Sequence, residues 1–142
     1  MKCETLAALD LSPKIQITSN KAVSGKSDLP AFCQIQGTIE PHIGFEARFP
    51  IGEWNGKYFQ AGCGGYCGQI LPDRETHSNS INHALRRGYA AITTDGGHQS
   101  DSIGDASWAS NPEVERIYAG EVIPHTHAAA FQLINEIYER DP

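Results

Sequence analysis

The segment KYFQAGCGGYCG, residues 57–68, decides the fold of this chain. Its first five residues predict a short strand that runs directly into a glycine-rich turn. Consecutive glycines let several backbone N–H groups point in one direction, which creates a concavity for an oxyanion or a phosphate. The segment is not a P-loop, because no Lys-Ser or Lys-Thr follows the glycines, and it is not a GxGxxG turn that opens a helix. It is therefore either a tight structural turn or a loop that binds an oxyanion.

A helix and a second strand are predicted after this turn. Ser78 or Ser80 can cap a helix that runs to Arg87, and Gly88 follows where a left-handed residue would end it. Residues 89–94 are apolar and β-branched, which is typical of a strand buried on both faces. This strand stops before a second pair of glycines.

Two more helices are predicted towards the end of the sequence. Asn111, Pro112 and Glu113 are typical of the N-cap and first two positions of a short helix. Residues 125–139 predict a longer one. Its apolar positions recur at spacings of three and four residues and are Ala128, Phe131, Ile134 (or Leu133) and Ile137.

The first third of the chain has the pattern of β structure. Residues 33–39 and 43–49 each alternate apolar with polar side chains, and Glu40-Pro41-His42 supplies a turn, so they predict an antiparallel hairpin. The fold class is therefore α/β, with this hairpin followed by strand, helix, strand and helix in a partly parallel sheet. No strand follows the last helix, so one edge of the sheet is expected to lack its next neighbour.

Composition excludes several classes of function. The 142 residues are 39% hydrophobic and 20% charged, which fits one soluble domain and no second one. Eleven Lys and Arg against 17 Asp and Glu give a net charge of −6, and the basic residues are not clustered, so no nucleic-acid partner is expected. No stretch approaches the ~18 to 20 apolar residues of a membrane span, so no membrane partner is expected.

The four cysteines leave more than one chemistry open. An even number in so short a chain favours an oxidising compartment, although the first residues lack the apolar region of a signal peptide. Cys63 and Cys67 suit either a small disulfide-closed loop or half of a zinc site, but no second pair with ligand spacing exists. Cys3 and Cys33, if bonded, would close a loop of about 30 residues. The alternative is four reduced, buried thiols.

The histidines raise a metal hypothesis and a triad hypothesis. Asp95, His98, His125 and His127 could share an ion, but the last two are predicted at a helix start, where their side chains diverge by about 200°. Capping and loop roles explain them better, and no metal is predicted. Asp95 and His98 could also belong to a Ser/His/Asp triad, yet no GxSxG or comparable nucleophile elbow occurs. No complete catalytic set is visible.

Several strings together carry a family resemblance across nearly the whole chain. They are Cys3-x-x-Leu6-x-x-Leu9 leading to Ile15 and Val23; residues 29–33 (LPAFC) with Gly37; residues 54–58 (WNGKY) running into residues 62–68; and residues 84–90 (ALRRGYA) with residues 94–98 (TDGGH). Each string alone is weak, but in this order they resemble the tannase and feruloyl esterase family of serine esterases.

The resemblance implies an α/β-hydrolase fold whose nucleophile lies in a Cys-Ser-x-Gly-Gly motif on the strand after the last predicted helix. We therefore expect residues 1–142 to be the N-terminal portion of an α/β-hydrolase domain, ending before that strand. The family's triad, its lid domain and the calcium site of that lid would lie downstream. Accordingly, no catalytic side chain and no cofactor is assigned to this chain.

Some roles are carried over to individual residues by the resemblance. Gly64 or Gly65 would provide a backbone N–H of the oxyanion hole. Asp95 and His98 would lie at the carboxyl end of a sheet strand, where ligand crevices form in α/β folds, and are candidates to line the cleft. The implied disulfides join Cys3 with Cys33, and Cys63 with Cys67.

The leading hypothesis is a secreted or periplasmic carboxylic ester hydrolase. By resemblance, it would act through an acyl-enzyme on small aromatic or phenolic esters of the feruloyl or galloyl type, and this chain alone would be inactive. The alternative is a non-catalytic binding or interaction module that keeps the half-sheet. Whether the chain is itself an enzyme is open, because it contains no recognisable nucleophile.

Overall fold

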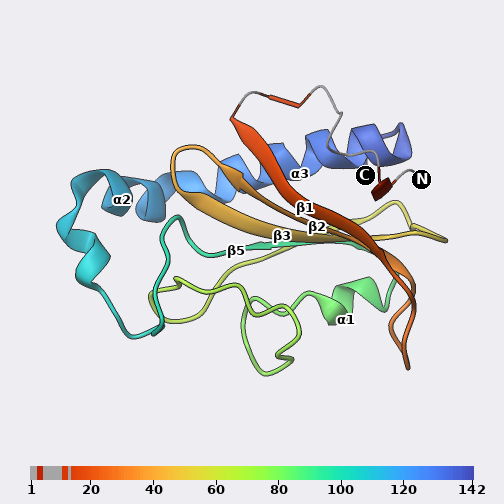
Figure 1. The fold of residues 1–142 in the computed structure, drawn as a ribbon, viewed down its shortest axis with the longest axis horizontal. Coiled ribbons are helices and arrows are strands. Elements are labelled where there is room, and N and C mark those ends of the chain that lie inside the picture. Colours follow the sequence, from red (N-terminus) through yellow and green to blue (C-terminus); the bar gives the residue numbers. More distant parts are fainter. Residues whose placement is uncertain (1–2, 5–10, 13) are drawn as a thin grey trace.

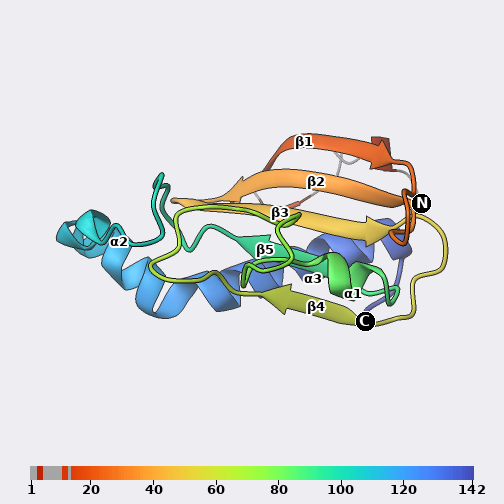
Figure 2. The same ribbon diagram turned by 90° about the horizontal axis from the view of Figure 1, so that it is seen from below.

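The computed structural model describes residues 3–4, 11–12 and 14–142, and its five strands form one mixed sheet (Figure 1). The strands are β1 (Ile15–Val23), β2 (Phe32–Ile39), β3 (Ile43–Pro50), β4 (Tyr58–Ala61) and β5 (Ala90–Thr94). Their order in the sheet is β1-β2-β3-β5-β4, which Figure 2 shows from top to bottom. β4 and β5 are parallel, and the other neighbouring strands are antiparallel. The predicted α/β fold class is confirmed.

The predicted hairpin and the strand before the glycines are both present. β2 and β3 pair in register from Phe32 opposite Pro50 to Ile39 opposite Ile43. β4 ends at Ala61, immediately before the glycine-rich turn. β4 is also an edge strand, because β5 is its one partner in the described sheet.

The strand β1 has no counterpart among the strands predicted from the sequence. It pairs with β2, but its register shifts between Ile17 and Ser19. Such an irregularity reverses which side chains face the core, so apolar residues do not alternate along the whole strand. Ile15 is buried whereas Ala22 is exposed, and the sequence pattern is too weak to define the element.

The helices are α1 (Asn82–Leu85), α2 (Pro112–Arg116) and α3 (Val122–Tyr138). A 3-10 turn at Ser107–Ser110 precedes α2, and a π-helical turn at Ile117–Glu121 joins α2 to α3. None of the helices in the described ranges is long and apolar enough to cross a membrane.

The first predicted helix is much shorter than expected, since it begins at Asn82 rather than after Ser78 or Ser80. The hydroxyl of Ser80 donates to the carbonyl of Pro72 instead of capping a helix. The segment before α1 is therefore folded against the sheet as a loop. Gly88 follows α1 with a φ of +78°, as its predicted role in ending the helix requires.

The last two helices differ from prediction in their limits. Asn111 caps α2 as predicted, since its side chain accepts a hydrogen bond from the Glu113 N–H. The longer helix begins at Val122, so His125 and His127 lie within it and not at its start. Of the apolar positions expected to be buried, Ala128 is exposed. The buried side chains of α3 are Val122, Thr126, Ala129, Ala130, Leu133, Ile134 and Ile137.

Both faces of the central strands are covered. Figure 1 shows α3 on one side of the sheet and α1 on the other. Phe45, Phe49 and Ile92 pack in the core that includes α3, whereas Ala91 packs with Ile81 and other residues of the α1 side. All eight residues of β3 are consequently buried, although its alternating sequence suggests one polar face.

A buried charge network occupies the α1 side of β3. Glu46 and Arg48 are 3% and 2% exposed, and the Arg48 Nε donates to the Glu46 carboxylate over 2.8 Å. The guanidinium also donates to Asp73 and to Asn82, which lie in the loop before α1 and in α1 itself. Arg48 therefore fixes this loop to the sheet.

The first disulfide implied by the family resemblance ties the N-terminal segment to the core. It joins Cys3 to Cys33, with 5.5 Å between the Cα atoms. The Cys3 carbonyl also accepts a hydrogen bond from the Asn20 amide on β1. Cys33 is wholly buried, so this disulfide is part of the hydrophobic core.

Candidate functional site

The glycine loop, residues 62–68, lies at the carboxyl end of β4. Because β4 and β5 are parallel, the carboxyl end of β5 and the following residues 95–98 are found at the same edge of the sheet. The Gly68 N–H donates to the Asp95 carbonyl over 2.7 Å, which joins the two segments. This is the edge at which open α/β sheets bind ligands.

The first four residues of the glycine loop, Gly62 to Gly65, have free backbone donors among the described residues. The N–H groups of Gly64 and Gly65 make no hydrogen bond to any described residue, whereas the next residues use theirs. The Tyr66 N–H donates to the Ile103 carbonyl over 2.7 Å, and the Cys67 N–H donates to the Gly64 carbonyl over 3.0 Å. The loop therefore begins with consecutive unused donors and ends with bonded ones, and unused neighbouring N–H groups are a requirement of an oxyanion site.

The shape of this turn requires a glycine at position 65. Gly65 has a φ of +59°, a conformation that side chains other than glycine rarely adopt. A Cβ atom there would lie 2.4 Å from the Ile103 carbonyl oxygen. The Tyr118 hydroxyl also donates to the Gly65 carbonyl over 3.4 Å. Neither Ile103 nor Tyr118 was singled out from the sequence, because both reach the loop through tertiary packing.

The second implied disulfide closes the glycine loop. Cys63 and Cys67 are bonded, with 5.2 Å between their Cα atoms. The bond lies against the turn after β5, where a Cβ atom on Gly96 would be 2.8 Å from the Cys67 sulfur. The half-zinc-site alternative for these two cysteines does not apply to the bonded pair.

Asp95 is buried at the carboxyl end of β5, and its side chain points inward. Its carboxylate accepts hydrogen bonds from the backbone N–H groups of Gly44 and Gly97 and from the Gln99 amide. Burial raises the pKa of Asp95 to about 6, because desolvation of the charge outweighs these hydrogen bonds. Asp95 thus joins β3 to the turn after β5, and its predicted contact with a ligand stays a prediction.

The Asp95→Asn variant is expected to lose a pH dependence of stability. Between about pH 4 and pH 6 the folded state binds the Asp95 proton more tightly than the unfolded chain does, so stability falls as pH rises through this range. The free energy of unfolding should fall by about 3 kcal/mol, because the pKa of Asp95 rises from its ordinary value to about 6 in the folded state. Urea unfolding from pH 4 to pH 7 should show a flatter profile for Asp95→Asn than for the exposed control Asp101→Asn. Parallel profiles would contradict this assignment.

His98 lies behind the glycine loop and is also buried. Its imidazole stacks on Trp108, with 4.3 Å between ring centroids, and the Tyr118 ring lies 5.9 Å away. Neither ring nitrogen has a hydrogen-bond partner among the described residues. Burial lowers the pKa of His98, against the opposing influence of the nearby Tyr66 and Gly96 backbone. His98 is thus placed within an aromatic cluster, and its predicted cleft-lining role stays a prediction.

The histidines of the metal hypothesis do not come together. His127 is exposed on α3 and packs beside Tyr58 and Phe131. Within residues 3–4, 11–12 and 14–142, no group of three or more His, Cys, Asp or Glu side chains is placed to hold a metal ion. The same residues contain no serine hydroxyl that is hydrogen-bonded to a histidine.

Cavities lie on both sides of the glycine loop. One of about 530 Å³ is lined by Cys63, Tyr118 and Val122 among others, and continues along β4 and α3. A smaller one of about 290 Å³ lies between Gly64, Gly65 and the loop before α1. The glycine loop is therefore reachable from either side.

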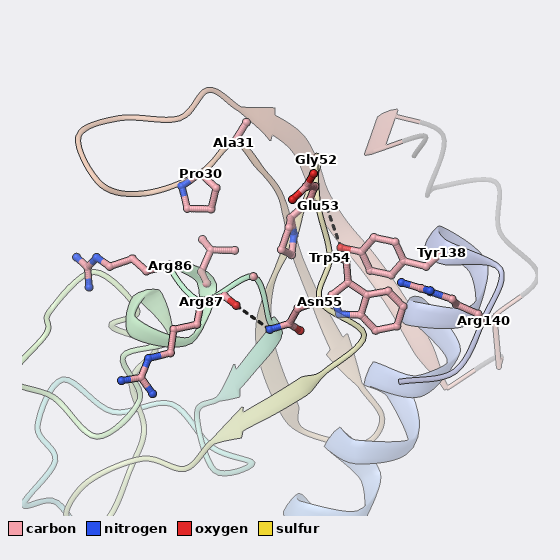
Figure 3. Close-up of a pocket in the computed structure, with 13 residues that line it drawn as sticks. Pro30, Ala31, Gly52, Glu53, Trp54, Asn55, Arg86, Arg87, Tyr138 and Arg140 are labelled. Carbon is pink, nitrogen blue, oxygen red and sulfur yellow. Dashed lines mark hydrogen bonds between the residues drawn. The ribbon is translucent and has the colours of Figure 1, made fainter.

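A larger cavity, of about 1040 Å³, opens at the other end of β4 and β5, where these strands begin (Figure 3). Its wall includes Trp54, whose ring stacks on Tyr138 and under the Arg140 guanidinium. Figure 3 shows the Arg86 and Arg87 side chains directed away from Trp54, so the cations do not converge on one point. Arg86 is moreover paired with Asp28 and Glu75. This cavity therefore presents no focused polar site, and the glycine loop is the better candidate.

Comparison with known proteins identifies the family of this chain. The family model described as tannase and feruloyl esterase matches residues 23–142. An uncharacterized esterase of Xanthomonas campestris is 47% identical over 85 residues, which are 57% of this chain and 14% of that protein. The mono(2-hydroxyethyl) terephthalate hydrolase of Piscinibacter sakaiensis is 30% identical over 108 residues, covering 65% of this chain and 18% of that protein.

A solved structure gives the same result for the fold. The crystal structure of an esterase from Aspergillus oryzae superposes with a TM-score of 0.80 at 20% identity, covering 97% of this chain and 30% of that one. The chain thus has an α/β-hydrolase-like fold and spans less than a third of the length of these relatives. Because the family model matches most of its length, the chain belongs to the tannase and feruloyl esterase family.

Proposed function

We propose that this chain supplies the oxyanion-binding loop of a serine ester hydrolase. When a nucleophile attacks an ester carbonyl, negative charge develops on the carbonyl oxygen, and fixed N–H donors about 2.7 to 3.1 Å away stabilise it. The observation that carries the proposal is the pair of free N–H groups on Gly64 and Gly65. The disulfide, the Ile103 carbonyl and the Tyr118 hydroxyl hold these donors in place before a substrate arrives.

The nucleophile would come from a segment that follows residue 142 in a longer protein. Two observations support this placement. β4 has no second partner among the described strands, and the 530 Å³ cavity runs beside it. The end of the chain lies near the start of β4, because Arg140 packs over Trp54 and the Trp54 indole donates to the Lys57 carbonyl. A following strand parallel to β4 would end beside the glycine loop.

The reaction would then proceed through an acyl-enzyme. The serine oxygen would bond to the carbonyl carbon and lose its proton to a base, and the alcohol would leave with a proton. Water would hydrolyse the acyl-enzyme in a second addition of the same kind. Both additions place an oxyanion at the glycine loop, so this chain's donors would act twice in each turnover.

An aromatic or phenolic ester is the proposed substrate, in line with the family and with the residues around the loop. Tyr66 is about half exposed and lies edge-on to Trp108, which in turn contacts Tyr118. Aromatic rings of a substrate pack favourably in such offset or edge-on arrangements. Two disulfides and an absence of free cysteines among the described residues support a secreted or periplasmic location.

A chimera tests the proposed function. The segment equivalent to residues 23–142 in the Piscinibacter hydrolase is replaced by this chain's own residues, and hydrolysis of mono(2-hydroxyethyl) terephthalate is measured. We expect the chimera to turn over this ester and the 142-residue chain alone to show no turnover. A second chimera in the Xanthomonas esterase, assayed on p-nitrophenyl acetate and p-nitrophenyl benzoate, guards against a single misfolded fusion.

The outcomes separate the alternatives. Two folded chimeras that bind ester but never hydrolyse it would overturn the proposal and favour a non-catalytic module. Turnover by the isolated chain that a serine substitution within residues 14–142 abolishes would also overturn it, because the nucleophile would then lie in this chain.

A further inference from the structure

We propose that the Cys63–Cys67 disulfide is a reducible clamp that holds the Gly64 and Gly65 donors in their oxyanion-binding position. A dithiol reductant would open the clamp, and the loop would lose its fixed donors while the fold persisted. This inference rests on the proposed function. The intact clamp would let the two N–H groups bind an oxyanion in an oxidising compartment. In a reducing compartment the clamp would open and this binding would be lost.

The position of the bond supports this role. It closes a ring that starts at Cys63 and ends at Cys67, and both free donors lie inside it. Two adjacent glycines have the largest conformational freedom of any pair of residues, so the ring closure removes more freedom here than elsewhere. The clamp therefore acts on the residues that the oxyanion would contact.

The two disulfides differ in how well a reductant can reach them. Cys3 and Cys33 are 6% and 0% exposed and belong to the core. Cys63 is half-buried and lines the cavities on both sides of the glycine loop. A thiolate attacks a disulfide sulfur directly, so its rate depends on access to that sulfur. The loop disulfide is expected to be reduced in the folded state, and the core one after unfolding.

Reduction would displace the loop and not merely loosen it. Two thiol sulfurs separate to a van der Waals distance of about 3.5 to 4 Å, so one of them must move. Cys67 is buried and its sulfur is packed against Gly96, where even a Cβ atom would lie 2.8 Å away. Both cysteines line the two cavities, but Cys63 is only half-buried, and its sulfur would lie farther from the same Cβ atom, at 3.4 Å. The movement would therefore fall on Cys63 and on the Gly64 peptide that follows it.

Reduction proceeds by two thiol–disulfide exchange steps. One thiolate of the dithiol bonds to the Cys63 sulfur, and the Cys67 sulfur leaves as a thiolate that takes up a proton. The second thiol of the reductant, as its thiolate, then attacks the mixed disulfide and releases the Cys63 thiol. The protein disulfide gains two electrons, and the dithiol is oxidised to its cyclic disulfide.

The test follows both disulfides in the 142-residue chain. Dithiothreitol is added to the folded protein, samples are alkylated at intervals, and mass spectrometry locates the modified cysteines. We expect Cys63 and Cys67 to be modified at least about tenfold faster than Cys3 and Cys33. In NMR spectra, amide hydrogen exchange of Tyr66 and Cys67, whose N–H groups are hydrogen-bonded to Ile103 and Gly64, should accelerate on reduction and return on reoxidation, while the amides of Ala91 and Ile92 in β5 stay protected.

A double variant and an anion probe complete the test. The Cys63→Ala/Cys67→Ala variant should show the fast Tyr66 exchange with or without reductant. Equal reduction rates of the two disulfides, unchanged Tyr66 and Cys67 exchange on reduction, or global unfolding of the variant would each overturn the clamp. Phenylphosphonate, a tetrahedral anion, should shift the Gly64 and Gly65 amides of the oxidised chain only. If it shifts neither amide in the oxidised chain, the oxyanion role fails, whereas the exchange data still decide the clamp.

Discussion

Replacing Arg48 with methionine is expected to lower the free energy of unfolding by about 3 to 5 kcal/mol, because it leaves a buried carboxylate without its cation. Glu46 is 3% exposed and is paired with the Arg48 Nε at 2.8 Å. The side-chain amides of Gln34 and Gln36 would still donate to Glu46, but neither carries charge. Urea denaturation at pH 7 measures the loss.

The same substitution should also release the loop before α1. The Arg48 guanidinium donates to the Asp73 carboxylate over 2.7 Å and to the Asn82 side chain. The Glu46→Gln/Arg48→Met variant removes the stranded charge and should recover a large part of the lost stability. Lys26→Met, at an exposed position, is the control for loss of a positive charge. An Arg48→Met variant as stable as Lys26→Met would show that the buried pair contributes no net stability.

The network around Arg48 could not be predicted from the sequence pattern, although the strand that carries it could. Alternation in residues 43–49 is enough to predict the strand, because side chains on a strand point to opposite faces in turn. Alternation also suggests that Glu46 and Arg48 face solvent. In the structure the loop before α1 covers this face, and the coverage depends on long-range pairing of Arg48 with Asp73 and Asn82. The shortened α1 has the same origin, because its predicted first turn is used in that loop.

The candidate site, like the fold, could be predicted from the sequence only in part. Gly64 and Gly65 could be singled out from the sequence because they lie in a glycine run directly after a predicted strand, and because the family resemblance implies that one of them is an oxyanion donor. The groups that fix them could not, because the Tyr118 hydroxyl is 53 residues away from the Gly65 carbonyl and no local pattern links the two. The burial of Asp95 was hidden for the same reason, since its partner Gly44 is 51 residues away in the sequence.

Replacing Gly65 with alanine in an active chimera is expected to lower kcat by about 10²- to 10³-fold, the effect of losing one oxyanion donor. The left-handed φ of +59° disfavours any side chain, and the new Cβ would overlap the Ile103 carbonyl oxygen. The turn must then rotate, and the rotation moves the Gly65 N–H and the adjacent Gly64 peptide away from the position of the oxyanion. Because the ground-state ester depends little on these donors, KM should change much less than kcat.

Gly52→Ala provides the matched control for this prediction. Gly52 has no left-handed φ, and a Cβ atom there would meet nothing within 4 Å, so its kcat and stability should stay close to those of the parent chimera. The oxyanion assignment predicts that Gly65→Ala lowers kcat on p-nitrophenyl acetate and on p-nitrophenyl benzoate by the same factor, since both form the same oxyanion. A loss confined to the benzoate ester would instead place Gly65 in substrate selection, and a parent-like kcat on both esters would remove this loop from the reaction.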